Sequence, residues 1–365
     1  MLCVVVSSKL QESEGKRVRE WMESILGFNT ILLTEPSEVE VDDGLIIVPA
    51  TGGTERIISN LIDSTDCPIM IWALSGNSLS SALEVYSVYR DRVRLSWGSM
   101  GRMLDEVGKF VGMCRFIRSK QKLGLVGGVS EWLLTSDKKD AEALGVELIE
   151  FELEEILKYG KDGIQRALEE MVKEYGLSAI TVRCFDLLKY DITACLALAN
   201  LDIPAGCEGD IGATLTMMIL HNITGKPCWM ANVCKLDPFV LAHCTVPLKM
   251  VERYELTTHA ESGKGVAIRG KLREGTVTLS RYGRGKMLIA LGRIVRNLRE
   301  DGFCRTQVEL EPYFDVEDFV ENALGNHVVL TYGDLRKDLK DFCKFLGIKP
   351  IILRPYRLHH ISGAD

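Results

Sequence analysis

The segment IPAGCEGDI (residues 203–211) places two carboxylates, Glu208 and Asp210, between an apolar strand and a helix. Glycines on both sides of Glu208 allow the backbone to turn sharply. We expect Asp210 to cap the helix of residues 211–223. Glu208 then lies at the carboxyl end of a strand, where open α/β sheets bind ligands. A carboxylate in that position can bind a metal ion or transfer a proton.

Two further polar residues, Arg183 and Asn232, follow apolar segments that we predict as strands of the same parallel sheet. Since the carboxyl ends of parallel strands share one edge, we expect Arg183, Glu208 and Asn232 to lie together. Asn232 offers an amide oxygen as a metal ligand, but it cannot take up a proton at neutral pH. Arg183 is a candidate for binding the substrate.

His243 and His327 follow or interrupt apolar runs, where a solvated histidine would be out of place. One such histidine is more often a hydrogen-bonded core residue than a ligand. Two of them, together with Glu208 and Asn232, form a set of imidazole, carboxylate and amide ligands that suits Mn²⁺, Co²⁺ or Fe²⁺. The residues therefore predict a divalent metal site, but ligands from separate loops have no diagnostic spacing.

Other residues suggest weaker alternatives. A zinc–thiolate site is conceivable because four cysteines crowd the same region, but each sits singly in an apolar run and fits a small buried hydrophobe. These are Cys207, Cys228, Cys234 and Cys244. The chain has no G-x-S-x-G motif for a serine hydrolase. His221 fits packing or surface, and we expect no role for His359 and His360.

The elements that carry these residues divide into three segments. Strands and helices alternate in residues 1–118, which predicts a Rossmann-like parallel α/β domain. The pattern restarts in residues 119–237, a second such domain that carries Glu208 and Asn232. Residues 238–365 show alternating strands instead and predict a mainly antiparallel, barrel-like domain that ends in a helix and a strand. The predicted fold class is thus α/β with a β-rich C-terminal domain.

The composition excludes several classes of function. The net charge of −7 argues against a nucleic-acid-binding surface or a basic membrane anchor. No apolar run approaches the roughly 20 residues that span a bilayer, and the first strand is too short for a signal peptide. The eleven cysteines form no C-x-x-C pair, which favours a reducing, cytoplasmic location.

Several short segments, in the right order, resemble the metal-site segments of the L-fucose and L-arabinose isomerases. Two others look typical of the shorter fucose-isomerase-like proteins. The resemblance covers roughly residues 123–330. The metal-site segments are residues 205–210, 229–232, 240–243 and 325–327, and the two others are residues 258–263 and 304–308.

This resemblance implies Mn²⁺ or a similar ion, bound by Glu208, His327 and, on the arabinose-isomerase pattern, His243. It implies aldose–ketose isomerisation through a cis-enediol, on a pentose, a 6-deoxyhexose or a derivative, with Glu208 as acid/base. His259, Glu261 and Asn326 are further candidates for binding the sugar. It also implies a homotrimer or homohexamer, in which a neighbour's first domain closes the active site.

The departure from the family is Asn232, where the isomerases have an acidic ligand. Asp210, Asp237 or Glu261 would have to supply the missing carboxylate, and we take Asp210 as the second catalytic candidate. Without it, two alternatives remain open. One is an epimerase or carbon–carbon lyase that also uses a metal enediolate, and the other is a non-catalytic sugar-binding relative.

Overall fold

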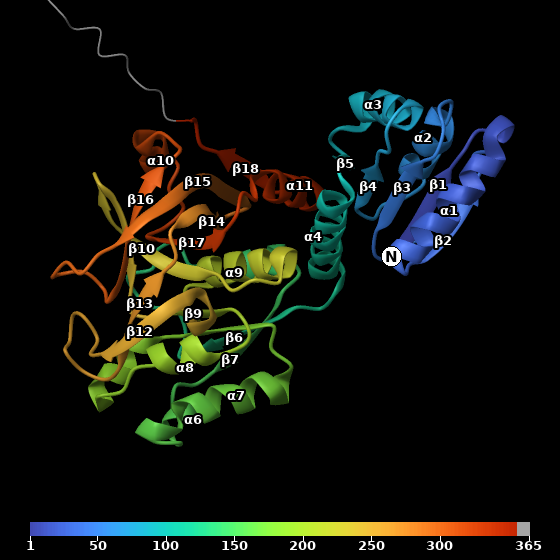
Figure 1. Ribbon diagram of the computed structural model, residues 1–365. Helices are drawn as coiled ribbons and strands as arrows, with labels where there is room; N and C mark the ends of the chain where they lie inside the picture. The colour runs from blue at the N-terminus through green and yellow to red at the C-terminus, as the bar shows by residue number, and fades with distance from the viewer. Residues whose placement is uncertain (356–365) are drawn as a thin grey trace, which may run out of the picture. The chain divides into compact units, whose positions relative to one another are not determined.

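The computed structural model describes residues 1–355 of the chain. Two parallel-stranded sheets are followed by a two-stranded ribbon and a closed antiparallel barrel (Figure 1). The first compact unit consists of Met1–Ser119 with the short stretches Asn222–Thr224 and Lys344–Gly347, and the second holds the other residues. None of the helices in residues 1–355 combines the length and the apolar composition that crossing a membrane requires.

The first unit contains a five-stranded parallel sheet with the strand order β2-β1-β3-β4-β5. Helices cover both faces of this sheet, which is why four of its strands are buried along their whole length. The strands are β1 (Leu2–Val6), β2 (Asn29–Leu33), β3 (Leu45–Pro49), β4 (Ile69–Trp72) and β5 (Val93–Ser96). The helices are α1 (Glu12–Leu26), α2 (Glu55–Asp63), α3 (Asn77–Tyr89) and α4 (Met100–Arg118).

The second unit begins with a four-stranded parallel sheet of order β7-β6-β8-β9. Its last strand lies two residues beyond the predicted one, so that Glu208 directly follows it. The strands are β6 (Lys122–Val126), β7 (Glu147–Phe151), β8 (Ala179–Val182) and β9 (Ala205–Cys207). The helices are α5 (Lys139–Ala143), α6 (Glu154–Leu157), α7 (Ile164–Tyr175), α8 (Cys195–Asn200) and α9 (Ile211–Thr224).

Six antiparallel strands then form a barrel of order β14-β17-β10-β11-β16-β15, which closes because β14 also pairs with β15. Apolar side chains such as Trp229, Phe239 and Leu279 pack together in its core. The barrel strands are β10 (Trp229–Leu236), β11 (Phe239–His243), β14 (Gly275–Gly283), β15 (Lys286–Asn297), β16 (Thr306–Pro312) and β17 (His327–Tyr332). The predicted order of parallel α/β segments followed by an antiparallel barrel is confirmed at this level.

Of the remaining elements, one strand joins the barrel sheet and the others lie outside it. The strands β12 (Val251–Thr257) and β13 (Ala267–Leu272) form a separate antiparallel ribbon. Two helices, α10 (Val316–Glu321) and α11 (Arg336–Leu346), lie in the C-terminal part of the chain. The last strand, β18 (Lys349–Ile352), pairs in parallel with β15 and therefore joins the barrel sheet.

One predicted strand belongs to another sheet. Residues 229–232, which we expected to continue the parallel sheet, begin β10, and β10 pairs antiparallel with β11 and β17. That prediction is wrong because Trp229, Met230 and Ala231 are all buried, although neighbouring residues point to opposite faces of the barrel wall. The segment is therefore as continuously apolar as a strand of a covered parallel sheet. Asn232 therefore reaches the site from the barrel, whereas Arg183 and Glu208 follow β8 and β9.

Candidate metal centre

The turn between β9 and α9 holds Glu208 in a conformation that few residues adopt. Glu208 has a φ of 62° and Gly209 a φ of 69°, in the left-handed region that is costly for a residue with a side chain. A Cβ atom on Gly209 would lie 2.2 Å from the carbonyl oxygen of Gly128. The backbone N–H of Ser130 donates to the carbonyl oxygen of Glu208 at 3.1 Å. The loop after β6 thus fixes the turn from outside.

Glu208 is 7% exposed, and its carboxylate has two different neighbours. The indole Nε1–H of Trp132 donates to Oε2 at 2.8 Å, and Oε1 lies 3.6 Å from Nε2 of His327. Burial by itself raises the pKa of Glu208, but His327, His243 and the Trp132 hydrogen bond together lower it to about 2. Glu208 is therefore ionised at neutral pH.

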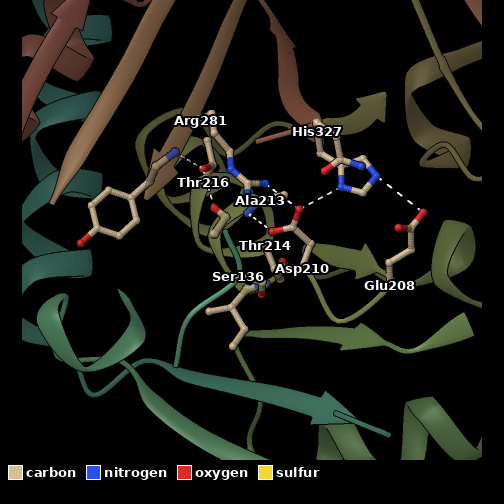
Figure 2. A network of polar contacts seen from close by, with 12 residues as sticks. Ser136, Glu208, Asp210, Ala213, Thr214, Thr216, Arg281 and His327 are labelled. Carbon is tan, nitrogen blue, oxygen red and sulfur yellow. Dashed lines mark hydrogen bonds and ion pairs between the residues drawn. The ribbon is translucent and has the colours of Figure 1, made fainter. Parts of the chain in front are cut away.

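His327, the first residue of β17, has no exposed surface. Its Nδ1 lies 2.8 Å from Oδ2 of Asp210 (Figure 2). A carboxylate accepts this hydrogen bond, so Nδ1 carries a proton, and Nε2 has no hydrogen-bond partner within residues 1–355. In the neutral ring, the Nε2 lone pair would face the Glu208 carboxylate, and a proton or a cation is needed between them. Burial lowers the pKa of His327, but Asp210 and Glu208 outweigh it and raise the pKa.

Asp210 lies behind His327 and joins it to a buried arginine. Its Oδ1 accepts a hydrogen bond from the N–H of Ala213 at 3.0 Å, so the predicted helix cap is confirmed. Its Oδ2 accepts from Nη1 of Arg281 on β14 at 2.7 Å, and both side chains are buried (Figure 2). Burial raises the pKa of Asp210, but Arg281 and His327 hold it well below its usual range. These contacts make Asp210 a residue that orients His327.

His243, the last residue of β11, is also buried, and its ring centre lies 5.4 Å from that of His327. Burial and, after it, the charge of His327 lower the pKa of His243 to about 4, which keeps the ring neutral at pH 7. The N–H of Thr245 donates to Nδ1 at 3.3 Å, which places the proton of the neutral ring on Nε2. A metal would therefore replace this long hydrogen bond at Nδ1 or require the other tautomer.

One donor atom from each of Glu208, His243 and His327 lies within 4.8 Å of the other two. Ligands about 2.1 Å from a metal ion are roughly 3–4 Å apart, so a small contraction would complete a site. The unpartnered Nε2 of His327 supplies a free lone pair, and Asp210 supplies the carboxylate that usually orients a ligating histidine. The three side chains therefore fit a divalent ion.

Asn232 lies beside this cluster. It is the register partner of His327 on the neighbouring strand, so the two Cα atoms are about 5 Å apart. Its Oδ1 accepts a hydrogen bond from Nδ2 of the exposed Asn326 at 3.1 Å. The structure thus brings Asn232 and Asn326 together next to His327.

The other predicted residues lie further out. Arg183 contacts Asp186 at 2.8 Å through Nε and donates to the carbonyl oxygen of Val129 at 3.4 Å, so it holds the loop that leads to Trp132. The ring of His259 packs edge-on against Phe185, which packs edge-on against Trp132, with ring centres 5.3 Å and 4.9 Å apart. Glu261 is exposed on the loop that follows His259.

Two residues of the site were missed in the sequence, Trp132 and Arg281. Trp132 follows the turn after β6, at the same sheet edge as Glu208, and its place in a Gly-rich loop was the available signal. Arg281 is the single charged residue of β14, buried to 1% exposure. Both become recognisable once β6, β9 and β14 are known to meet.

The cysteines form no metal site in residues 1–355. All eleven are free thiols, and none joins a group of three or more closely placed ligands there. His359 and His360 lie outside the described residues.

Comparison with known proteins leaves the cluster as the strongest guide to function. No protein-family model matches the chain, and no curated protein matches it significantly.

Proposed function

We propose that this chain is a metal-dependent aldose–ketose isomerase of the L-fucose and L-arabinose isomerase type. The observation that carries the proposal is the buried Glu208–His243–His327 cluster beside a strained turn. Glu208, His243 and His327, with Asn232 beside them, would hold Mn²⁺, with Co²⁺ or Fe²⁺ as alternatives. The substrate would be a pentose, a 6-deoxyhexose or a derivative, and the protein a homotrimer or homohexamer, as the resemblance implies.

A bound divalent ion would supply electrophilic stabilisation of negative charge on neighbouring carbonyl and hydroxyl oxygens of the sugar. Glu208 would take the proton from C2 and return it to C1, while O1 gains a proton and O2 loses one. With a pKa of about 2, this carboxylate removes a proton only from a strongly acidified carbon. Trp132 would fix the orientation of the carboxylate by donating to Oε2.

The cluster contains a single carboxylate that is free to move a proton. Asp210 is held by Arg281 and His327, and Asn232 has no proton to exchange. We therefore expect one base to act on one face of the cis-enediol. In such a mechanism part of the C2 proton is transferred directly to C1, and the rest exchanges with water.

The test uses sugars deuterated at C2. Mn²⁺-loaded protein is incubated with deuterated L-fucose and L-arabinose, and the ketose is analysed by NMR for label at C1. We expect ketose with part of the label retained. Absence of any ketose and of any metal-dependent exchange at C2, over a panel of pentoses and 6-deoxyhexoses, would reject the isomerase proposal.

The test variant is Glu208→Gln, and its matched control is Glu147→Gln. Glu208→Gln removes the base and a metal ligand, so we expect turnover to fall by at least about 10³-fold with the fold retained. Glu147 is an exposed carboxylate on β7 of the same sheet, and its loss should leave turnover unchanged. Full activity in Glu208→Gln would contradict the assigned role.

The same single carboxylate also suits a metal-enediolate epimerase or a carbon–carbon lyase, because a retro-aldol cleavage needs one base at the start. An epimerase would exchange the C2 label with water without forming ketose. A lyase would yield shorter fragments. A non-catalytic sugar-binding relative predicts neither exchange nor products. The NMR analysis separates all three.

A further inference from the structure

A basic cavity opens beside the β12–β13 ribbon and shares no residue with the metal cluster. Its volume is about 300 Å³. The charged residues in its wall are Arg253, Glu255, Arg269, Lys271, Glu274, Arg296 and Arg299. Five positive and two negative side chains line the cavity, and two of the cations also pair with carboxylates outside its wall, Lys271 with Glu252 at 2.9 Å and Arg296 with Glu309 at 2.6 Å. One positive charge remains in excess, although the whole chain carries a net charge of −7. This local excess opposes the overall charge and is therefore not a consequence of composition.

The pairing of the ribbon places like charges against each other. Arg253 on β12 is the register partner of Lys271 on β13. Like charges directly opposite each other in an antiparallel pair lower stability. Lys271 reaches Glu252 at 2.9 Å, but Arg253 forms no ion pair within residues 1–355. The ribbon thus keeps a repulsive pair that a bound anion would relieve.

The guanidinium groups of the cavity are oriented but not saturated. Glu255 contacts Arg299 at 2.7 Å and Arg269 at 3.8 Å, so one carboxylate serves two arginines. The Nε of Arg269 is buried and finds no hydrogen-bond partner among residues 1–355. Several planar donors that converge on one concave surface are the usual means of binding phosphate oxygens.

We propose that this cavity binds a small molecule that carries a phosphate dianion, either a phosphomonoester or a pyrophosphate. A phosphate group offers three acceptor oxygens to the arginines of the wall, whereas a monocarboxylate offers two. The volume suits a small ligand rather than a polymer. The net charge of the chain also opposes binding of nucleic acid. The proposal is independent of the chemistry at Glu208.

The test is a calorimetric titration of the full chain with pyrophosphate and with a pentose 5-phosphate at low ionic strength. The variant Arg253→Ser/Lys271→Ser removes two cations from the cavity. The control Lys161→Ser/Arg166→Ser removes two exposed cations from the region of α7, so both proteins have the same net charge. We expect about tenfold weaker binding in the cavity variant and a change below about twofold in the control.

The fold is checked by urea unfolding. Because the cavity variant loses a repulsive pair, its midpoint should stay unchanged or rise, which separates lost binding from lost folding. Arg253→Gln alone gives the same comparison if the double variant does not fold. Equal weakening in the two double variants, or no binding of either phosphate by the unaltered chain, would overturn the proposal. So would tight binding of single-stranded RNA or anionic vesicles without binding of pyrophosphate.

Discussion

At the scale of single residues, the contact between Glu208 and His327 defines the centre. Nε2 of His327 lies 3.6 Å from Oε1 of Glu208 and has no other polar partner in the described part of the chain. Without a metal, a proton on Nε2 is favourable, because the hydrogen bond to Asp210 and, after it, the contact with Glu208 outweigh burial and raise the pKa of His327. A divalent ion bound to the same nitrogen must displace that proton.

Metal affinity should therefore rise with pH. His327 has a raised pKa, so below that pKa each unit of increasing pH should tighten Mn²⁺ binding by about tenfold, and above it the affinity should level off. Titrations in buffers of different ionisation enthalpy should show release of about one proton per metal. Affinity independent of pH between 6 and 8 would show that His327 is not a ligand.

The stability of the metal-free protein should show the opposite dependence. A histidine whose folded pKa is raised contributes stability that is fully present below its unfolded pKa of about 6.5. This contribution is lost as the pH rises through the folded pKa. As the pH rises through the raised pKa of His327, the metal-free protein should thus lose this contribution to its free energy of unfolding. The metal binds best in that same pH range.

Trp132 fixes the orientation of the Glu208 carboxylate, because its indole N–H donates a hydrogen bond to Oε2. In Trp132→Phe the ring remains against Phe185 but the donor is lost. We expect the pKa of Glu208 to rise and Mn²⁺ affinity to fall by about tenfold, measured by competition with a chelator. The control Trp21→Phe, on α1, should retain the affinity, and equal losses in both variants would contradict the role of the hydrogen bond.

At the scale of elements, the N-terminus of α9 connects the metal-binding turn to two strands of the barrel. Asp210 at its N-terminus accepts from the helix backbone with one oxygen and from His327 and Arg281 with the other. The start of a helix, a barrel strand and a ligating histidine are thus joined through one carboxylate. Because Arg281 has almost no exposed surface, its charge depends on this partner.

The substitution Asp210→Asn separates these roles. The amide oxygen can still cap α9, but the charge that faces Arg281 and His327 is gone. We expect a loss of about 3 kcal/mol in the free energy of unfolding, measured in urea, and weaker Mn²⁺ binding.

The matched control is Asp315→Asn, at the cap of α10, where the carboxylate accepts from the N–H of Asp318 at 2.9 Å. Among residues 1–355 no buried arginine contacts this carboxylate, and the loss should stay below about 1 kcal/mol. Similar losses in the two variants would mean that capping alone accounts for the effect at Asp210.

At the scale of the whole molecule, the chain forms two compact units, and all residues of the metal cluster belong to the second. Ligand binding stabilises the unit that contains the site, because the unfolded segment lacks the assembled ligands. The first unit has its own parallel sheet and its own core on each face of that sheet. The two units can therefore respond differently to a metal.

Calorimetric unfolding with and without Mn²⁺ tests this division. At about 100 times its Kd, Mn²⁺ should stabilise the second unit by about 2.7 kcal/mol and leave the transition of the first unit in place. The variant His243→Gln should lose most of the shift. A shift of the entire unfolding profile as one transition would show that the units unfold together.

The sequence by itself was sufficient wherever the relevant forces are local. The turn at Glu208, the cap at Asp210 and the end of α9 at Gly225 follow from the conformational preferences of a few adjacent residues. Alternation of apolar segments likewise gave the parallel sheets and the antiparallel C-terminal strands. The histidine positions in apolar runs correctly indicated burial for His243 and His327.

Only the tertiary structure decided which of these residues meet. β10 has the composition of a parallel strand, and its place in the barrel depends on pairing with β17, nearly 100 residues later in the chain. The same closure brings His327 to Glu208 and Arg281 to Asp210. Such pairs depend on sheet register and strand order, which no local pattern records. The sequence thus determined the candidate ligands, whereas the closed barrel determined that Glu208, His243 and His327 converge.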